Sequence, residues 1–177
     1  MVPPSYTSSY KFYIIRYDSA GNVLSALPLQ IEGVLLECHT EFRYDAGLQR
    51  YYVAGFRNYY SGGDVLPLAY GGTPIQGTMY VLALDTAGNE IWRRQEIESA
   101  GLQSSQLHGL RIDGDSNLYI CGSYFRVNDE TVSFGNYSFP MDVAGNIVYV
   151  MKLDPQGNVI WGTTPSTESA ANTAYKE

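Results

Sequence analysis

The chain carries little charge, and most of that charge is negative. Only 16% of its 177 residues are charged, with 11 lysines and arginines against 18 aspartates and glutamates, so the net charge is −7. Binding nucleic acid requires a basic stripe that contacts phosphates. The basic residues do not cluster beyond Arg93-Arg94, which argues against a nucleic-acid partner.

Long apolar runs and helical periodicity are also missing. No run of about 18 apolar residues occurs, so no membrane span is expected. The start, Met1-Val2-Pro3-Pro4, has neither the basic region nor the apolar core of a secretory signal. If the protein is exported, its signal must lie outside this sequence or have been removed.

Motifs for common chemistry are scarce. Phosphate-binding loops, Cys-x-x-Cys pairs and Gly-x-Ser-x-Gly elbows are absent, so no cofactor is expected. The two cysteines, Cys38 and Cys121, fall at non-equivalent positions of the repeat described below and define no disulfide framework. Buried free thiols are the default expectation, and a single bridge between the two stays open.

A hairpin motif is present three times. Each copy has an apolar strand, an Asp, two turn-prone residues, Gly-Asn, and a second apolar strand, and the copies are 67 and 69 residues apart. The Asp carboxylate can accept backbone hydrogen bonds within the turn, and the Gly supplies the left-handed conformation. We therefore expect nine turn residues: Asp18, Gly21, Asn22, Asp85, Gly88, Asn89, Asp154, Gly157 and Asn158.

A second element repeats with nearly the same period. Tyr52-Val53-Ala54-Gly55 and Tyr119-Ile120-Cys121-Gly122 both follow a short strand and a turn, and the glycines are 67 residues apart. Each unit should thus contain four strands. The expected strands are 34–45, 50–57, 78–85 and 89–97, then 106–113, 117–126, 147–154 and 158–164, with 11–18 and 22–29 as the last two of a preceding unit.

A four-stranded antiparallel unit of this length is typical of a β-propeller blade. The predicted fold is all-β, a partial β-propeller of about two and a half antiparallel four-stranded blades. The predicted segments are a lead-in at 1–10, a half blade at 11–30, blades at 31–98 and 99–165, and a tail at 166–177 leading into a missing blade. Because two and a half blades cannot close a ring, the chain could be part of a larger propeller, a subunit of a ring of copies, or an open stack capped by a partner.

The last blade resembles a known family. Asn117-Leu118-Tyr119-Ile120-Cys121-Gly122, Phe134-Gly135, Lys152-Leu153-Asp154 and Gly157-Asn158-Val159-Ile160-Trp161 look like the SBBP-type β-propeller repeat of secreted bacterial proteins. The match covers nearly all of 105–161. It is looser over 34–97, where Gly71-Gly72 stands in place of the Phe-Gly element, and the first hairpin has Leu24-Ser25 where the family has Trp. The resemblance implies a secreted or cell-surface location.

Three groups of residues suggest metal or catalytic sites, and each has a simpler interpretation. His39 and His108 differ by one residue in strand register, which would turn one side chain to the opposite face. Asp113-Gly114-Asp115-Ser116-Asn117 has oxygen ligands at alternate positions, but Leu118 and Tyr124 stand where a calcium loop needs Gly and Glu. Glu37 and Glu41 share a strand face, as glycoside chemistry would need, without a counterpart in the next blade. We expect no metal and no catalytic residue.

The long loops at 58–77 and 127–146 are the best candidates for binding, because loops of this length are commonly functional. Their aromatic rings and polar groups could stack on a sugar, or they could pack over blade edges and cap turns. The candidate ligand-binding residues are Tyr59, Tyr60, Asp64, Tyr70, Asn136, Tyr137 and Phe139.

The sequence thus favours a non-catalytic extracellular β-propeller segment, a binding or scaffold module of a larger secreted or surface protein, with a protein or glycan as partner. The rest of a larger propeller, or other chains, would cover its open blade faces. The alternatives are a structural subunit whose blades complete a ring or capped stack, and a propeller enzyme acting on polysaccharide.

Overall fold

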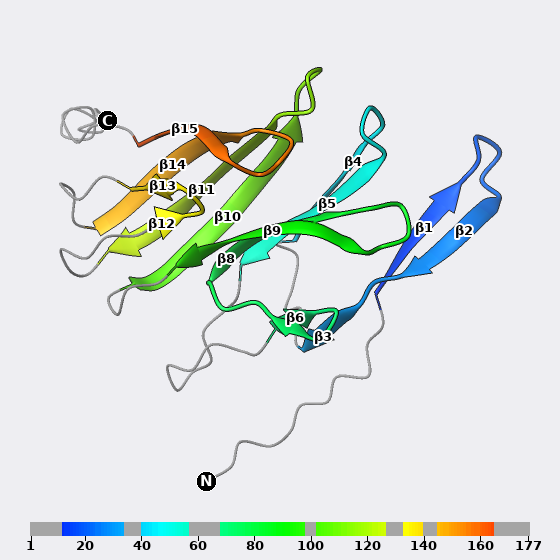
Figure 1. The fold of residues 1–177 in the computed structure, drawn as a ribbon, viewed down its shortest axis with the longest axis horizontal. Coiled ribbons are helices and arrows are strands. Elements are labelled where there is room, and N and C mark those ends of the chain that lie inside the picture. Colours follow the sequence, from blue (N-terminus) through cyan, green and yellow to red (C-terminus); the bar gives the residue numbers. More distant parts are fainter. Residues whose placement is uncertain are drawn as a thin grey trace, which may run out of the picture.

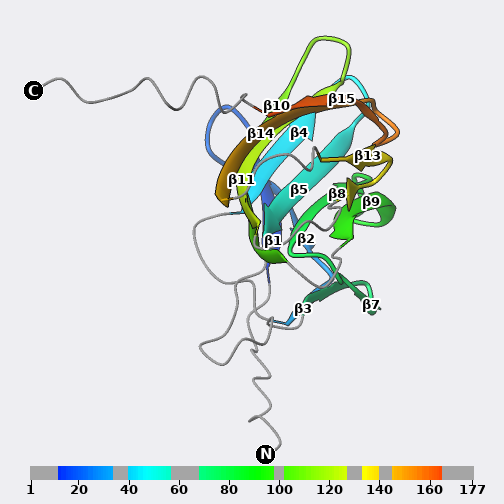
Figure 2. The same cartoon turned by 90° about the vertical axis from the view of Figure 1, so that its left-hand side faces the viewer.

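The structure is a computed structural model that describes residues 12–33, 40–56, 68–97, 102–126, 133–139 and 145–164. The predicted fold class is confirmed at the level of an all-β chain with antiparallel four-stranded sheets. No helix occurs in these segments, and their strands form no closed ring. The main sheets lie in a row in chain order (Figure 1), and a view from the end shows one sheet behind another (Figure 2).

The row begins with the N-terminal hairpin, β1 (Tyr13–Tyr17) and β2 (Val23–Pro28). The first unit pairs β4 (Glu41–Asp45), β5 (Arg50–Phe56), β8 (Met79–Leu84) and β9 (Glu90–Ile97). The second unit pairs β10 (Leu102–Ile112), β11 (Leu118–Arg126), β14 (Gly145–Leu153) and β15 (Val159–Thr163). Within the described segments, the strands follow those expected from the repeat to within a few residues.

The units stack face to face, and the third strand of the first unit, β8, places apolar residues in the contacts on both of its faces. Along β8, Tyr80, Leu82 and Leu84 join a core with Ile14 of the N-terminal hairpin. The alternate residues Met79, Val81 and Ala83 join the core shared with the second unit. A strand buried on both faces has a continuous apolar sequence rather than an alternating one, and β8 is buried at all six positions.

Short strands link each unit to the one before it, and the sequence analysis did not find them. β12 (Ser133–Phe134) and β13 (Tyr137–Ser138) extend the first unit by pairing with β9. β6 (Leu68–Tyr70) and β7 (Thr73–Pro74) likewise join β3 (Ile31–Gly33), just after β2. Tyr70-Gly71 is thus the counterpart of Phe134-Gly135, the element that seemed missing from the first unit, and both glycines have positive φ.

The repeated glycines of the second strands make room for a tyrosine of the third strand. Gly55 pairs with Tyr80, and a Cβ added to Gly55 would lie 2.9 Å from the Tyr80 hydroxyl. Gly122 pairs with Tyr149 in the same way, and its Cβ would lie 2.3 Å from that hydroxyl and 1.9 Å from the Gln106 carbonyl oxygen. Each unit therefore requires glycine on the second strand, opposite the tyrosine of the third.

Candidate functional site

The Asp-x-x-Gly-Asn turns bind their own backbone. In the β1–β2 turn, Asp18 Oδ1 accepts hydrogen bonds from the N–H groups of Ala20 at 2.9 Å and Asn22 at 2.8 Å. The Asn22 side-chain amide donates to Asp18 Oδ2 at 2.8 Å, and Gly21 has φ of +85°. The same arrangement recurs through Asp85, Gly88 and Asn89 and through Asp154, Gly157 and Asn158.

These bonds keep the carboxylates ionised. Hydrogen bonds from Asn22 and Asn89 hold the pKa values of Asp18 and Asp85 below their usual range. Desolvation raises the pKa of Asp154, but the bonds from Asn158 and Gln156 outweigh it and the net shift is downward. A general acid or base at neutral pH needs a pKa near 7, so these shifts favour a structural role.

The calcium-like segment forms a fourth turn of the same kind. Asp113 Oδ1 accepts bonds from the N–H groups of Asp115 at 3.0 Å and Asn117 at 2.9 Å, and Lys152 Nζ lies 3.2 Å from Oδ2. Desolvation raises the pKa of Asp113, but the donors, chiefly Asn117 and Lys152, hold it well below its usual range. Ser116, with φ of +62°, takes the place that glycine has in the other turns. The segment is the tight turn that the sequence favoured.

Among the loop residues predicted to bind a ligand, Tyr70 and Phe139 are buried. The Tyr70 hydroxyl donates to the Gly88 carbonyl at 2.6 Å, which ties the β6–β7 hairpin to the β8–β9 turn. The Phe139 ring centroid lies 4.8 Å from that of Tyr124, in the core shared by the two units. The structure therefore gives both rings a packing role.

Asn136 and Tyr137 lie at the turn of the β12–β13 hairpin. The Asn136 side chain donates to the Val159 carbonyl at 3.1 Å and accepts from the Val159 N–H at 2.8 Å. The half-buried Tyr137 ring lies edge-on to Phe139, with centroids 5.3 Å apart. Tyr137 also lies over Gly162, whose added Cβ would meet the ring at 2.6 Å. Tyr59, Tyr60 and Asp64 lie outside the described residues, and ligand binding by the loops stays a prediction.

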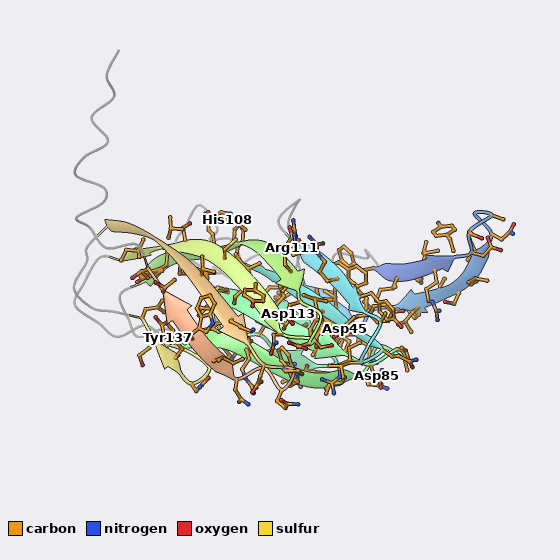
Figure 3. All side chains as sticks on the ribbon, turned by 90° about the horizontal axis from the view of Figure 1, so that it is seen from above. Asp45, Asp85, His108, Arg111, Asp113 and Tyr137 are labelled. Atoms are coloured by element: carbon orange, nitrogen blue, oxygen red, sulfur yellow. The ribbon has the colours of Figure 1, made fainter. Side chains whose placement is uncertain are left out.

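The structure brings no metal site together in the described segments. His108 is exposed, with Nε2 3.0 Å from Ser123 Oγ, and Figure 3 shows it apart from Asp45 and Asp113. Glu41 forms ion pairs with Arg43 at 2.7 Å and Arg111 at 3.8 Å. Nowhere in the described part of the chain do three His, Cys, Asp or Glu side chains gather to hold a metal ion. The Cys121 thiol is free; His39, Glu37 and Cys38 fall outside the described segments.

An uncovered surface on the N-terminal hairpin was not predicted from the sequence. Tyr13, Ile15 and Tyr17 are 51%, 47% and 57% exposed, whereas the equivalent residues of β8 are at most 2% exposed. A pocket of about 330 Å³ lies beside this strand, between the hairpin and the first unit, lined by Ile14, Ile15, Phe42 and Val53 among others. Aligning the three hairpins on their Asp residues would have shown that these three positions belong to a buried face.

In the described segments no helix combines the length and the apolarity needed to cross a membrane. No protein-family model matches the sequence, and no curated protein matches it. The proposals below therefore depend on the geometry of the repeated units.

Proposed function

We propose that the chain is a non-catalytic binding or scaffold module of a larger secreted or cell-surface protein. In this proposal the stacked units are part of a β-propeller like the SBBP-type repeat that the sequence resembles. The observation that carries it is the stacking of one four-stranded unit on the next through a shared apolar core. Such a stack can hold loops in fixed positions, which is what a binding scaffold requires.

Polar contacts reinforce the stacking of the first unit on the second. Trp92 Nε1 donates to the Pro155 carbonyl at 3.0 Å, and Arg50 donates to the same oxygen at 2.9 Å. Arg94 Nε donates to the Gly157 carbonyl at 2.8 Å. Three side chains of the first unit thus bind the β14–β15 turn of the second unit. Because hydrogen bonds depend on direction, they fix the relative orientation of the two units, which apolar contact alone does not.

The proposed ligand is a protein or a glycan bound by the loops between the second and third strands of each unit. Exposed tyrosines suit such a surface, because their rings contact apolar faces while the hydroxyl bonds polar groups. Tyr59, Tyr60 and Asp64 from the first loop and Tyr137 from the second are the proposed contacts. The buried Tyr70 and Phe139 would support these loops from below.

A glycan array, together with a pull-down from culture supernatant, tests this function. The Tyr59→Ala/Tyr60→Ala variant should lose at least tenfold in affinity for any ligand found, whereas Tyr44→Ala, at an exposed tyrosine of β4, should not. Tyr137→Phe keeps the ring on Gly162 and tests the hydroxyl alone. Binding that survives the double substitution would contradict the loop assignment, and blank results in both screens would contradict the function.

A second candidate, a structural subunit that completes a ring or capped stack with other chains, is favoured by the free face of the second unit. Val148 and Val150 on β14 are exposed, although the equivalent Met79 and Val81 on β8 are buried. Trp161 is also exposed, whereas its counterpart Trp92 packs against the next unit. Solution mass decides this candidate: it predicts discrete oligomers, and a soluble monomer at all concentrations would exclude it.

A further inference from the structure

The outer edge of β1 has backbone groups that pair with no strand in the described part of the chain. In the hairpin, the Leu29 N–H donates to the Phe12 carbonyl and the Asp18 N–H to the Asn22 carbonyl. In an antiparallel sheet, the backbone N–H and C=O groups of successive residues point to opposite neighbouring strands. The two bonds above show that the backbone groups of the even-numbered residues of β1 point to β2. The N–H and C=O groups of Tyr13, Ile15 and Tyr17 therefore point to the other edge, where no described strand pairs with them. An open edge of this kind is a template for another strand.

The same edge is covered in both complete units. β5 pairs with β8 from Tyr51↔Leu84 to Phe56↔Met79, and β11 pairs with β14 from Leu118↔Leu153 onward. The hairpins β1–β2, β8–β9 and β14–β15 share the same turn geometry and the same irregularity beside it. β5 and β11 are therefore two examples of the kind of strand that fits the edge of β1, and they also indicate its register.

The tyrosine of the third strand sets the first requirement for that strand. Tyr13 is the equivalent of Tyr80 and Tyr149, whose hydroxyls lie over Gly55 and Gly122. A strand paired with β1 in the same register would place one residue directly opposite Tyr13. With the Tyr13 ring placed as the rings of Tyr80 and Tyr149 are, that residue has to be glycine, because a Cβ there would meet the ring.

The pocket sets the second requirement. Phe42 of β4 is partly exposed beside it, whereas the equivalent Leu110 of the second unit is fully buried. Leu110 is covered by a core that includes Tyr52 and Ala54 of β5. Residues at those two positions of an added strand would enter the pocket against Phe42 and Val53, so they should be aromatic and small, as they are in β5.

A charged residue on β1 supports the aromatic position. Arg16 is the equivalent of Lys152, which lies opposite Tyr119 with Nζ 5.0 Å from the ring centroid. An aromatic ring opposite Arg16 would gain the same cation–π contact. The cation–π contact of Arg16, the pocket beside Phe42 and the ring of Tyr13 therefore all favour the same register for the added strand.

We infer that the free edge of β1 is a binding site for an extended strand with the pattern aromatic–aliphatic–small–glycine, paired antiparallel with its aromatic residue opposite Arg16 and its glycine opposite Tyr13. The partner is a polypeptide strand recognised by backbone pairing and by side chains that fill the adjoining pocket. The added strand would extend the same stack that Ile14 already begins against the first unit. The inference rests on the scaffold role proposed above, because it names the partner which that role needs at the N-terminal hairpin.

A peptide with the sequence of β5, RYYVAGF, flanked by lysines for solubility, tests the inference against the full ¹⁵N-labelled chain. We expect saturable shifts of the amide signals of Tyr13, Ile15 and Tyr17, and slower hydrogen exchange at those amides. A peptide with valine in place of the glycine should bind at least tenfold more weakly. A scrambled peptide is the composition control.

Substitutions on the chain complete the test. Ile15→Pro removes an N–H that only the edge uses and should abolish binding; Tyr13→Ala removes the ring that demands glycine and should let the valine peptide bind as well as the parent. Absence of shifts in β1, or equal affinity of the glycine and valine peptides for the unmodified chain, would overturn the inference, and neither result depends on a variant that has to fold. A loop-ligand screen that fails while the peptide binds would count against the proposed loop function alone.

Discussion

Replacing Gly157 by alanine tests the contact between the first unit and the second, in which Trp92 of the first packs on Gly157 of the second. Gly157 has φ of +81°, and the Trp92 ring of the neighbouring unit lies directly over it. An added Cβ would lie 2.9 Å from Trp92 Cε3 and 3.0 Å from Cδ2. The ring cannot move away freely, because its Nε1 donates to the Pro155 carbonyl in the same turn. The substitution therefore combines a backbone penalty with a steric one.

The two penalties can be separated. The left-handed conformation costs a residue with a Cβ about 1–2 kcal/mol, and overpacking against a fixed ring costs about 1–3 kcal/mol more. We expect Gly157→Ala to lower the free energy of unfolding by about 3 kcal/mol. In a Trp92→Ala background only the backbone penalty remains, so the same substitution should cost about 1–2 kcal/mol.

Urea unfolding followed by circular dichroism measures the four members of this double-mutant cycle, provided that the slope with urea stays constant. Gly21→Ala is the matched control, because Gly21 has φ of +85° but no atom within 4 Å of an added Cβ. It should cost only the backbone penalty. Equal losses for Gly157→Ala with and without Trp92 would refute the proposed contact between the units.

Three further predictions concern the turns and the core. Ser116→Gly should raise the free energy of unfolding by about 1 kcal/mol, measured by urea titration, because Ser116 occupies a left-handed position; a loss would show that the serine side chain outweighs this strain. The pKa of Asp85 is lowered from 3.8 by its bonds from Asn89, so its stabilising contribution is present above that pH and lost as pH falls through the lower folded value. Asp85→Asn should therefore flatten the acid limb of the stability–pH curve, and an unchanged limb would contradict the assigned bonds. Burial raises the pKa of Tyr80 from 10.0 to about 12, so Tyr80 should lower stability as pH rises between those values. Tyr80→Phe should make this loss smaller, with the remaining loss coming from other buried tyrosines such as Tyr52 and Tyr70. Urea titration at several pH values measures the loss, and an unchanged loss would contradict the burial of Tyr80.

The repeated strands were predictable because their signals are local. Asp-x-x-Gly-Asn determines its own turn through bonds within five residues, and the apolar runs on either side mark the strands. The fourth turn was harder to find, because Ser116 replaces the glycine. The Asp–Asn pair, Asp113 and Asn117, was the part of the pattern that persisted.

The short strands were missed because nothing local defines them. β6 and β12 are two or three residues long, and each exists only because a distant strand pairs with it. Tyr70 shows the consequence for site prediction. Its place in a long loop suggested ligand contact, but its pairing with Ile31 buries it. Burial of this kind depends on tertiary structure, which composition and spacing do not specify.

The central claim is that the outer edge of β1, in the N-terminal hairpin, is open to another strand. Native-state hydrogen exchange of β1 and β8 tests this claim most directly. We predict that the amides of Tyr13, Ile15 and Tyr17 exchange rapidly, while the equivalent amides of Tyr80, Leu82 and Leu84, covered by β5, are strongly protected. Equal protection of the two sets in the isolated chain would contradict the claim, since the edge of β1 would then already be paired.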